Sequence, residues 1–217
     1  MKNFAVIFDM DGVLIDSSQI VFESFNKILE PHNFRINEEE YKQYLGITAQ
    51  GLCNKWKKEY GLDFTAEFIA DETTRLQMNV LKSKPMDPSA LNFLKELKRG
   101  FIPIGLGTSS PRIRAEKILE SLGIKNFFGA IVTGDEVIEH KPNPEIFLKV
   151  SEKLGIAPEK CIVIEDAING VEAAKRGKMK AIAYLTGNHK EEEFKHSDFI
   201  LRSFSELSLE KISKLFT

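Results

Sequence analysis

The stretch that decides the fold runs from Phe4 to Leu14 and has the sequence FAVIFDMDGVL. It begins with apolar residues typical of a buried β-strand and ends at two carboxylates, Asp9 and Asp11. Gly12 follows directly and allows the chain to turn. Ligands of open α/β sheets bind at the carboxyl ends of the strands. Two acids held this close together need a cation or a shared proton, so the stretch indicates a metal-assisted site with a carboxylate nucleophile.

Two other interpretations of the Asp-x-Asp-Gly motif must be considered. A calcium loop of the EF-hand type needs glycine at its sixth position, glutamate at its twelfth and a helix on each side. Here the glycine is fourth, the twelfth residue is Ile20, and a strand precedes the motif. The second interpretation, a simple polar turn, stays open on this motif alone because short motifs recur by chance.

A second predicted strand, Ile102–Gly107, also ends in polar residues, Thr108 to Ser110. Pro111–Leu122 is predicted to be the next helix, with Ile113 among the residues of its buried face. Hydroxyl groups beside the amides of a loop and a helix start can bind a phosphate. The competing interpretation is an ordinary helix cap, which Ser and Thr often supply.

A third predicted strand, Ala130–Thr133, is followed by Lys141. Pro142 follows this lysine directly, Pro144 comes two residues later, and both stiffen the backbone. A rigidly presented lysine is a good point charge for a phosphate. The alternative is a lysine in solvent, which is the usual state of this residue.

A fourth predicted strand, Cys161–Ile164, ends at two adjacent acids, Glu165 and Asp166. An aspartate that caps the following helix, Ile168–Lys175, would explain one acid but not both.

Taken together, the four strand ends resemble one known family. The chain resembles the haloacid dehalogenase-like hydrolases of the subgroup that has a helical cap after the first strand. It looks most like the branch of beta-phosphoglucomutase and phosphoglycolate phosphatase. The resemblance covers nearly the whole chain and rests on Asp9–Ser17, Thr108–Ser110, Lys141–Pro144 and Val163–Gly170.

The resemblance implies a role for each matching residue. Asp9 would be the nucleophile that forms an aspartyl phosphate, and Asp11 the general acid and base. Mg²⁺ would be the cofactor. Its ligands would be the Asp9 and Asp166 carboxylates and the Asp11 main-chain carbonyl, with Glu165 as an alternate ligand. The phosphate would be held by Thr108, Ser109 and Lys141.

Two departures from the family pattern bear on the substrate. The mutase branch has a histidine where this chain has Val21, and an arginine where it has Ala49 after Gly46-Ile47-Thr48. Both differences favour a phosphatase over a sugar phosphomutase of the beta-phosphoglucomutase type. A non-catalytic relative that binds a phosphometabolite or a protein is a further alternative. The expected contacts to the leaving group are Gln19, Thr48, Gln50, Arg75 and Arg112.

The periodicity of apolar residues divides the chain. From residue 85 onward, helices and strands alternate, which predicts a parallel sheet with right-handed crossovers. Between Asp16 and Lys84 the spacing is helical throughout. We therefore expect an α/β fold: a Rossmann-like core from residues 1–15 and 85–217, and an inserted helical cap from residues 16–84. The predicted cap helices lie within residues 20–29, 38–45, 51–60 and 64–81.

Composition excludes several classes of protein. The 217 residues carry a net charge of −2, which argues against a general nucleic-acid surface. No stretch approaches the roughly 20 apolar residues of a membrane span. The chain enters its first strand at once, which argues against a signal peptide, and its two cysteines fit a reduced compartment. We expect a cytoplasmic monomer or weak dimer that binds a small phosphorylated metabolite, with neither nucleic acid nor membrane as a partner.

Overall fold

The chain forms two compact units in a computed structural model that describes all residues except 1–3, 45–46, 48, 82–85 and 217. The first, here called the α/β unit, combines Met1–Ile15 with Pro85–Thr217. The second, here called the helical unit, is Asp16–Lys84. The α/β fold class with a parallel sheet and inserted helices, expected from the sequence, is confirmed.

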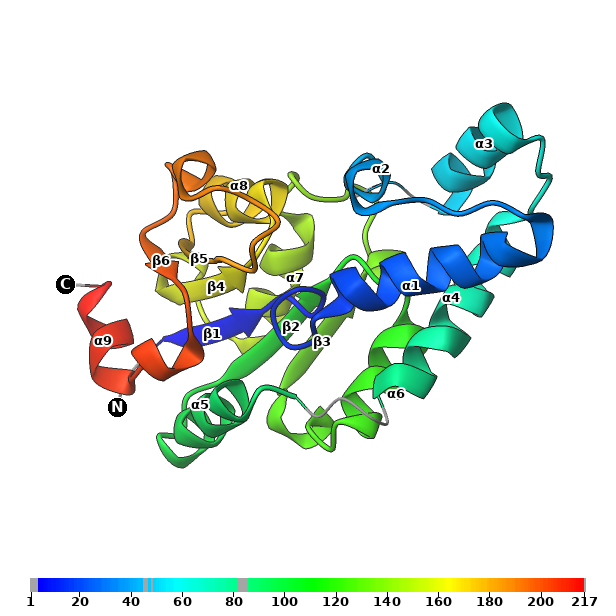
Figure 1. Cartoon of the computed structure of the whole chain (residues 1–217). Coiled ribbons are helices and arrows are strands. Elements are labelled where there is room, and N and C mark those ends of the chain that lie inside the picture. The colour runs from blue at the N-terminus through cyan, green and yellow to red at the C-terminus, as the bar shows by residue number, and fades with distance from the viewer. Residues whose placement is uncertain (1–3, 45–46, 48, 82–85, 217) are drawn as a thin grey trace. The chain divides into compact units, whose positions relative to one another are not determined.

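The α/β unit is built on a six-stranded sheet in which all neighbouring strands are parallel (Figure 1). The strand order is β3-β2-β1-β4-β5-β6, so β1 lies at the centre. Long apolar runs form these strands because both faces of the sheet are covered by helices. The strands are β1 Ala5–Phe8, β2 Ile104–Thr108, β3 Ala130–Thr133, β4 Cys161–Glu165, β5 Lys180–Tyr184 and β6 Phe199–Leu201.

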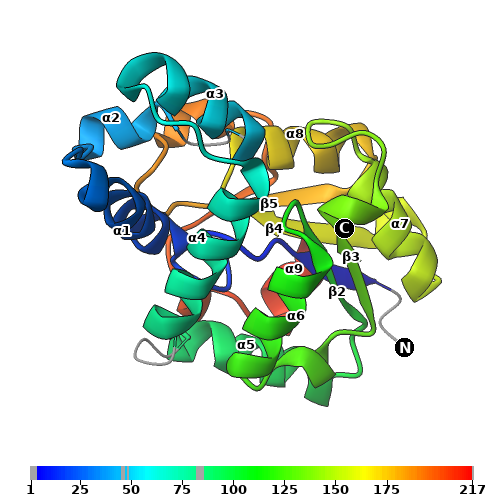
Figure 2. The same ribbon diagram turned by 90° about the vertical axis from the view of Figure 1, so that its right-hand side faces the viewer.

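Helices cover both faces of the sheet (Figure 2). On one side lie α5 and α6, and on the other lie α7 and α8. Successive side chains of β1 point to opposite faces of the sheet and so contact different helices. Ile7 packs in the apolar cluster on the α7 side, whereas the ring of Phe8 lies 6.2 Å from that of Phe93 on α5. The helices are α5 Pro88–Arg99, α6 Arg112–Ser121, α7 Glu145–Leu154, α8 Ile168–Arg176 and α9 Leu209–Lys214.

The register of the central strands decides which loops meet. Phe8, the last residue of β1, is level with Leu106 of β2 and Ile164 of β4. The chain after β1 therefore emerges next to the ends of β2 and β4. Polar residues that are far apart in the sequence are brought to one edge of the sheet by this register.

The helical unit has its own aromatic core. Trp56 is fully buried, and its ring lies 5.4 Å from that of Phe25 in an edge-to-face arrangement. Asn26 connects its helix, α1 (Ser17–Leu29), to the segment that follows it, because its side chain donates to the carbonyl of Ile36 and accepts from the Ile36 amide. The helices are α1 Ser17–Leu29, α2 Glu38–Lys42, α3 Ala49–Tyr60 and α4 Ala66–Leu81, with a 3₁₀ turn at Glu30–His32.

Three sequence expectations need correction. Ile113, expected on the buried face of its helix, is 68% exposed, because it lies five residues before Ile118 and five residues turn a helix well past the buried stripe. The helix predicted over residues 38–45 ends at Lys42. The strand predicted from Ile102 begins at Ile104, because the amide of Ile102 closes the end of α5 by donating to Leu97.

In the described part of the chain, we find no helix with the length and hydropathy that crossing a bilayer requires.

Candidate functional site

The loop after β1 places two aspartates at the edge of the sheet. Asp9 directly follows the strand, donates its amide to the Ile164 carbonyl at 2.9 Å, and is 6% exposed. The chain then turns tightly, since the carbonyl of Met10 accepts from Leu14 at 2.9 Å. Gly12 has φ +81° in this turn, a conformation that side chains with a Cβ rarely adopt.

Lys141 joins the loop after β1 to the end of β4. Its Nζ lies 2.6 Å from Asp9 Oδ1 and 2.7 Å from Glu165 Oε1, and it donates to the carbonyl of Gly107 at 3.2 Å. The side chain is 6% exposed, and Nζ lies 4.7 Å from the ring centre of Phe147. These contacts rule out the interpretation of Lys141 as an ordinary lysine in solvent.

Burial and charge act against each other on this pair. Burial works to lower the pKa of Lys141, but the charges of Asp9 and Glu165 outweigh it, so the pKa is raised and the ammonium stays charged. Burial raises the pKa of Asp9, and the charges of Glu165 and Asp11 add to this while Lys141 opposes it. The charge of Lys141 therefore favours the ionised form of the buried Asp9, while burial and the neighbouring acids disfavour it.

The two acids at the end of β4 lie in different surroundings. Glu165 is buried, and its Oε2 accepts the amide of Ala167 at 2.8 Å while Oε1 accepts from Lys141. Asp166 lies against the turn after β1: a Cβ added to Gly12 would fall 1.9 Å from Asp166 Oδ2. The helix α8 has Ala167 at its N-cap without a side-chain hydrogen bond, so neither acid is the helix cap considered from the sequence.

The charges of the site do not balance. Burial and the neighbouring carboxylates raise the pKa of Asp166, as they do for Asp9. Within the part of the chain that the structure describes, two cations lie against four carboxylates, so full ionisation of the acids would leave an excess of two negative charges. The acids are Asp9, Asp11, Glu165 and Asp166, and the cations are Lys141 and Arg114. A divalent cation fits such an excess.

The donors available for a cation are few. Among the described residues, no three His, Cys, Asp or Glu side chains are grouped as a metal site. A site built from two carboxylates and one main-chain carbonyl does not need such a group. The contact of Asp166 with Gly12 brings one carboxylate against the main chain that follows Asp11. The donor set is all oxygen, which suits Mg²⁺.

The hydroxyls at the end of β2 and directly after it do not cap the next helix. Thr108 is 1% exposed, and its Oγ1 accepts the amide of Ser110 at 3.2 Å. The N-cap of α6 is Pro111, which has no side-chain hydrogen bond. Ser109 is exposed, and the strand pairing sets Thr108 level with Thr133. The hydroxyls therefore stay at the edge of the sheet that also carries Asp9.

Arg114 is the residue that sequence reasoning missed. Its guanidinium binds both carboxylate oxygens of Asp11, at 2.6 Å and 2.5 Å. Arg112, which the sequence suggested as a substrate contact, instead donates to the carbonyl of Ile131 at 3.0 Å and pairs with Glu136. Two arginines in the first turn of one helix look alike in the sequence, and no signal there distinguishes them.

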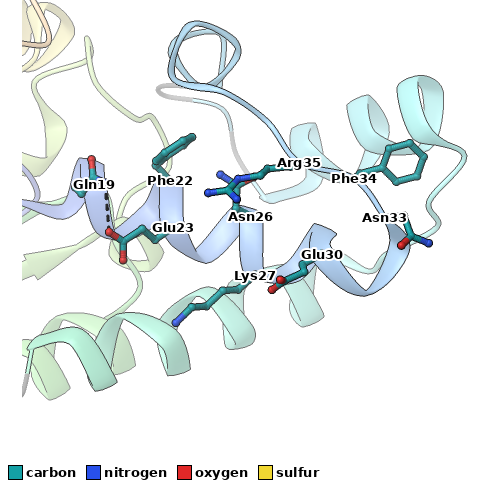
Figure 3. Close-up of a pocket in the computed structure, with 9 residues that line it drawn as sticks. All are labelled: Gln19, Phe22, Glu23, Asn26, Lys27, Glu30, Asn33, Phe34 and Arg35. Carbon is teal, nitrogen blue, oxygen red and sulfur yellow. Dashed lines mark hydrogen bonds between the residues drawn. The ribbon is translucent and has the colours of Figure 1, made fainter.

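The candidate residues of the helical unit come from three different helices, α1, α3 and α4, and from the segment before α3. Gln19 donates to Glu23 at 3.3 Å and helps to line a pocket of about 710 Å³ along α1 (Figure 3). Gln50 is exposed and donates to Asn54 at 3.3 Å. Arg75 pairs with Glu72. Thr48 lies outside the described residues. The other pocket residues are Phe22, Glu23, Asn26, Lys27, Glu30, Asn33, Phe34 and Arg35.

Comparison with known proteins bears on this site. A family model described as haloacid dehalogenase-like hydrolase matches residues 6–184. A phosphorylated carbohydrates phosphatase of Thermotoga maritima is 34% identical over 82% of this chain and 83% of its own. A beta-phosphoglucomutase of Bacillus subtilis is 31% identical over 95% of this chain and 92% of its own. The crystal structure of a beta-phosphoglucomutase from Clostridium difficile superposes with a TM-score of 0.81 at 26% identity, and covers 100% of this chain and 97% of its own.

Proposed function

This chain belongs to the haloacid dehalogenase-like hydrolase family, and from that premise we propose that it is a magnesium-dependent phosphatase of small phosphorylated metabolites. The observation that carries the proposal is the buried contact between Lys141 and Asp9 at the carboxyl end of β1. A protein that only binds a ligand has no need to bury a carboxylate and a lysine together, because burying charges costs free energy.

We assign Mg²⁺ to the oxygens of Asp9, Asp166 and the Asp11 main chain. Bound there, the ion would neutralise charge on the site and on the phosphoryl group. The family resemblance also offers Glu165 as an alternate ligand. Both of its oxygens already accept hydrogen bonds, from Lys141 and the Ala167 amide, so we assign it to holding Lys141.

The chemistry would proceed in two displacements on phosphorus. In the first, the Asp9 carboxylate attacks the phosphoryl group while the ester P–O bond breaks, and Asp11 gives a proton to the leaving oxygen. In the second, water attacks the aspartyl phosphate, Asp11 takes the water proton, and inorganic phosphate leaves as Asp9 is restored. Thr108, Ser109 and Lys141 would hold the oxygens that are not transferred.

The substrate class follows from the relatives and from two residues. The Thermotoga relative is named as a phosphatase of phosphorylated carbohydrates, and we propose a sugar phosphate or a phosphoglycolate-like substrate. Val21 and Ala49 stand where the mutase branch has histidine and arginine. We propose residues 16–84 as the cap that selects the leaving group, and residues 1–15 with 85–217 as the catalytic core. A soluble monomer or weak dimer in the cytoplasm remains our proposal.

The test is an assay of phosphate release with p-nitrophenyl phosphate, followed by a panel of phosphometabolites. Activity should vanish with EDTA and return with Mg²⁺, while Ca²⁺ should inhibit because it prefers looser, higher coordination. Full activity without metal would contradict the magnesium assignment. The Bacillus relative makes a phosphomutase the second candidate. Interconversion of glucose 1-phosphate and glucose 6-phosphate that is faster than phosphate release would favour it.

A further inference from the structure

The contact between Arg114 and Asp11 crosses from α6 to the loop after β1. Nη1 of Arg114 donates to Asp11 Oδ2 at 2.6 Å, and Nη2 donates to Oδ1 at 2.5 Å. Ser110 Oγ donates to the same Oδ2 at 2.8 Å, and Arg114 also bonds this hydroxyl. The Arg114 side chain is 12% exposed. The Asp11 carboxylate is thus held by the mostly buried guanidinium of Arg114, which binds both of its oxygens in a forked arrangement, and by the Ser110 hydroxyl.

The geometry of this contact restricts how Asp11 can turn. A guanidinium is planar and rigid, so two parallel bonds to one carboxylate fix the carboxylate plane as well as its position. The hydroxyl of Ser110 adds a third point of attachment. A lysine at the same place would supply a point charge without the fork. Most exposed ion pairs lack this control, because long side chains in solvent move.

We propose that Arg114 is a positioning residue that sets the orientation of the Asp11 carboxylate for proton transfer. This inference rests on the proposed phosphatase function. Asp11 gives its proton to the leaving oxygen as the P–O bond breaks and later takes one from the attacking water. Both transfers need a defined distance and angle between the carboxylate and the reacting oxygen. In this proposal Arg114 acts on the reaction through Asp11 and has no part in holding the phosphate.

The test compares substrates that differ in their need for a proton. Alkyl phosphates have poor leaving groups, whereas p-nitrophenolate leaves with little protonation. We expect Arg114→Met to lower kcat/KM for an alkyl phosphate by about tenfold or more, within the range of general acid–base catalysis, and to change p-nitrophenyl phosphate turnover by less than about threefold. In the double variant with Asp11→Asn, Arg114→Met should add no further loss. Lys117→Met removes the same charge from an exposed position on α6 and should leave both rates unchanged.

Two further measurements keep the inference falsifiable. Arg114→Lys keeps the positive charge but lacks the two parallel hydrogen bonds of the guanidinium. It should also lower kcat/KM more for the alkyl phosphate than for p-nitrophenyl phosphate, by a smaller factor than Arg114→Met. It replaces Arg114→Met in the test if that variant does not fold. NMR of the guanidinium should show slow rotation about the Arg114 Cζ–Nη bonds in the wild type and fast rotation in Asp11→Asn.

The failure of each proposal has its own signature. An equal loss on both substrates, additive losses in the double variant, or identical guanidinium rotation with and without the Asp11 carboxylate would overturn the role of Arg114. A wild-type protein that releases no phosphate from any substrate would instead overturn the proposed function itself.

Discussion

Asp9 and Asp11 are two residues apart in the sequence but differ in their surroundings. Asp9 is buried and paired with Lys141, whereas Asp11 is half-buried and paired with Arg114. In the proposed mechanism, the buried Asp9 beside a fixed cation is the nucleophile, and the more accessible Asp11 is the acid and base.

We therefore expect different losses when either acid is replaced. Asp9→Asn should abolish both turnover and the covalent intermediate. Asp11→Asn should slow turnover of a poor leaving group by about 10²–10⁴-fold, and slow p-nitrophenyl phosphate less. Steady-state assays on the two substrates, with mass spectrometry of the trapped intermediate, provide the measurement. Equal losses on both substrates would mean that Asp11 acts on geometry alone.

Lys141 should matter for stability as well as for activity. Lys141→Met leaves Asp9 and Glu165 buried without their cation, and breaking such a contact costs about 3–5 kcal/mol. This loss of folding free energy should become smaller as the pH falls. Without Lys141 the pKa of Asp9 rises further, so the folded state binds a proton more tightly than the unfolded state does, and protonation favours folding. Urea unfolding between pH 8 and pH 5 would measure this.

The exposed Lys160→Met serves as a control of equal charge change for that experiment and should unfold like the wild type at both pH values. A Lys141→Met protein as stable as the wild type at pH 8 would contradict the assignment of Lys141 as the main counter-charge of Asp9.

At the scale of the elements, the turn after β1 approaches the end of β4 closely. Gly12→Ala is strained by the positive φ and also forces Asp166 to move. Gly123→Ala is the matched control, since Gly123 has φ +67° and nothing within 4 Å of an added Cβ. We expect Gly123→Ala to cost roughly 1–2 kcal/mol with normal kcat. Gly12→Ala should cost more and also lose magnesium-dependent turnover. Thermal unfolding and kinetics measure both effects, and equal behaviour of the two variants would show that the contact is unimportant.

The turn after β3 is held by Glu136, which accepts from Lys153 at 2.9 Å and from the Thr133 amide at 3.0 Å, and pairs with Arg112. Burial works to raise the pKa of Glu136, but the bonds from Lys153 and Thr133 outweigh it and lower the pKa to about 2.

The lowered pKa of Glu136 stabilises the folded state at pH values above the ordinary pKa of a glutamate. This stabilisation is lost as the pH falls toward the folded-state pKa of about 2. Glu136→Gln should therefore destabilise by about 1–2 kcal/mol at pH 7, after discounting for solvent screening, and by less near pH 3. Chemical denaturation at both pH values tests this. The exposed Glu152→Gln should change stability little at either pH. A Glu136→Gln deficit that is the same at pH 7 and pH 3 would contradict the mechanism.

At the scale of the whole molecule, the site residues and the candidate selectivity residues belong to different units. Asp9, Thr108 and Lys141 lie in the α/β unit, and Gln19 and Gln50 in the helical unit. We expect Gln19→Ala and Gln50→Ala to change kcat/KM unequally across a phosphometabolite panel and to leave magnesium affinity nearly unchanged. The panel and isothermal titration provide the measurements. If every substrate changes by one common factor, the helical unit does not select among them.

The sequence by itself determined the alternation of elements and predicted that polar residues gather where the strands end. Strands such as β4 are continuous apolar runs that end in acids, and the parallel order then requires those ends to share one edge. Local patterns carry this information because side-chain burial on a strand or helix repeats with a fixed period.

Only the tertiary structure decided the contacts. Lys141 could have been solvated and Arg112 could have faced the site; packing of α6 against β3 instead turned Arg112 to Glu136 and Arg114 to Asp11. Ile113 is a different case, because the helical period alone turns it away from the buried stripe that contains Ile118. The physical reason is that these charged side chains have partners far away in the sequence, 24 positions for Arg112 and Glu136, 103 for Arg114 and Asp11, and 132 for Lys141 and Asp9. No local pattern in the chain encodes such partners.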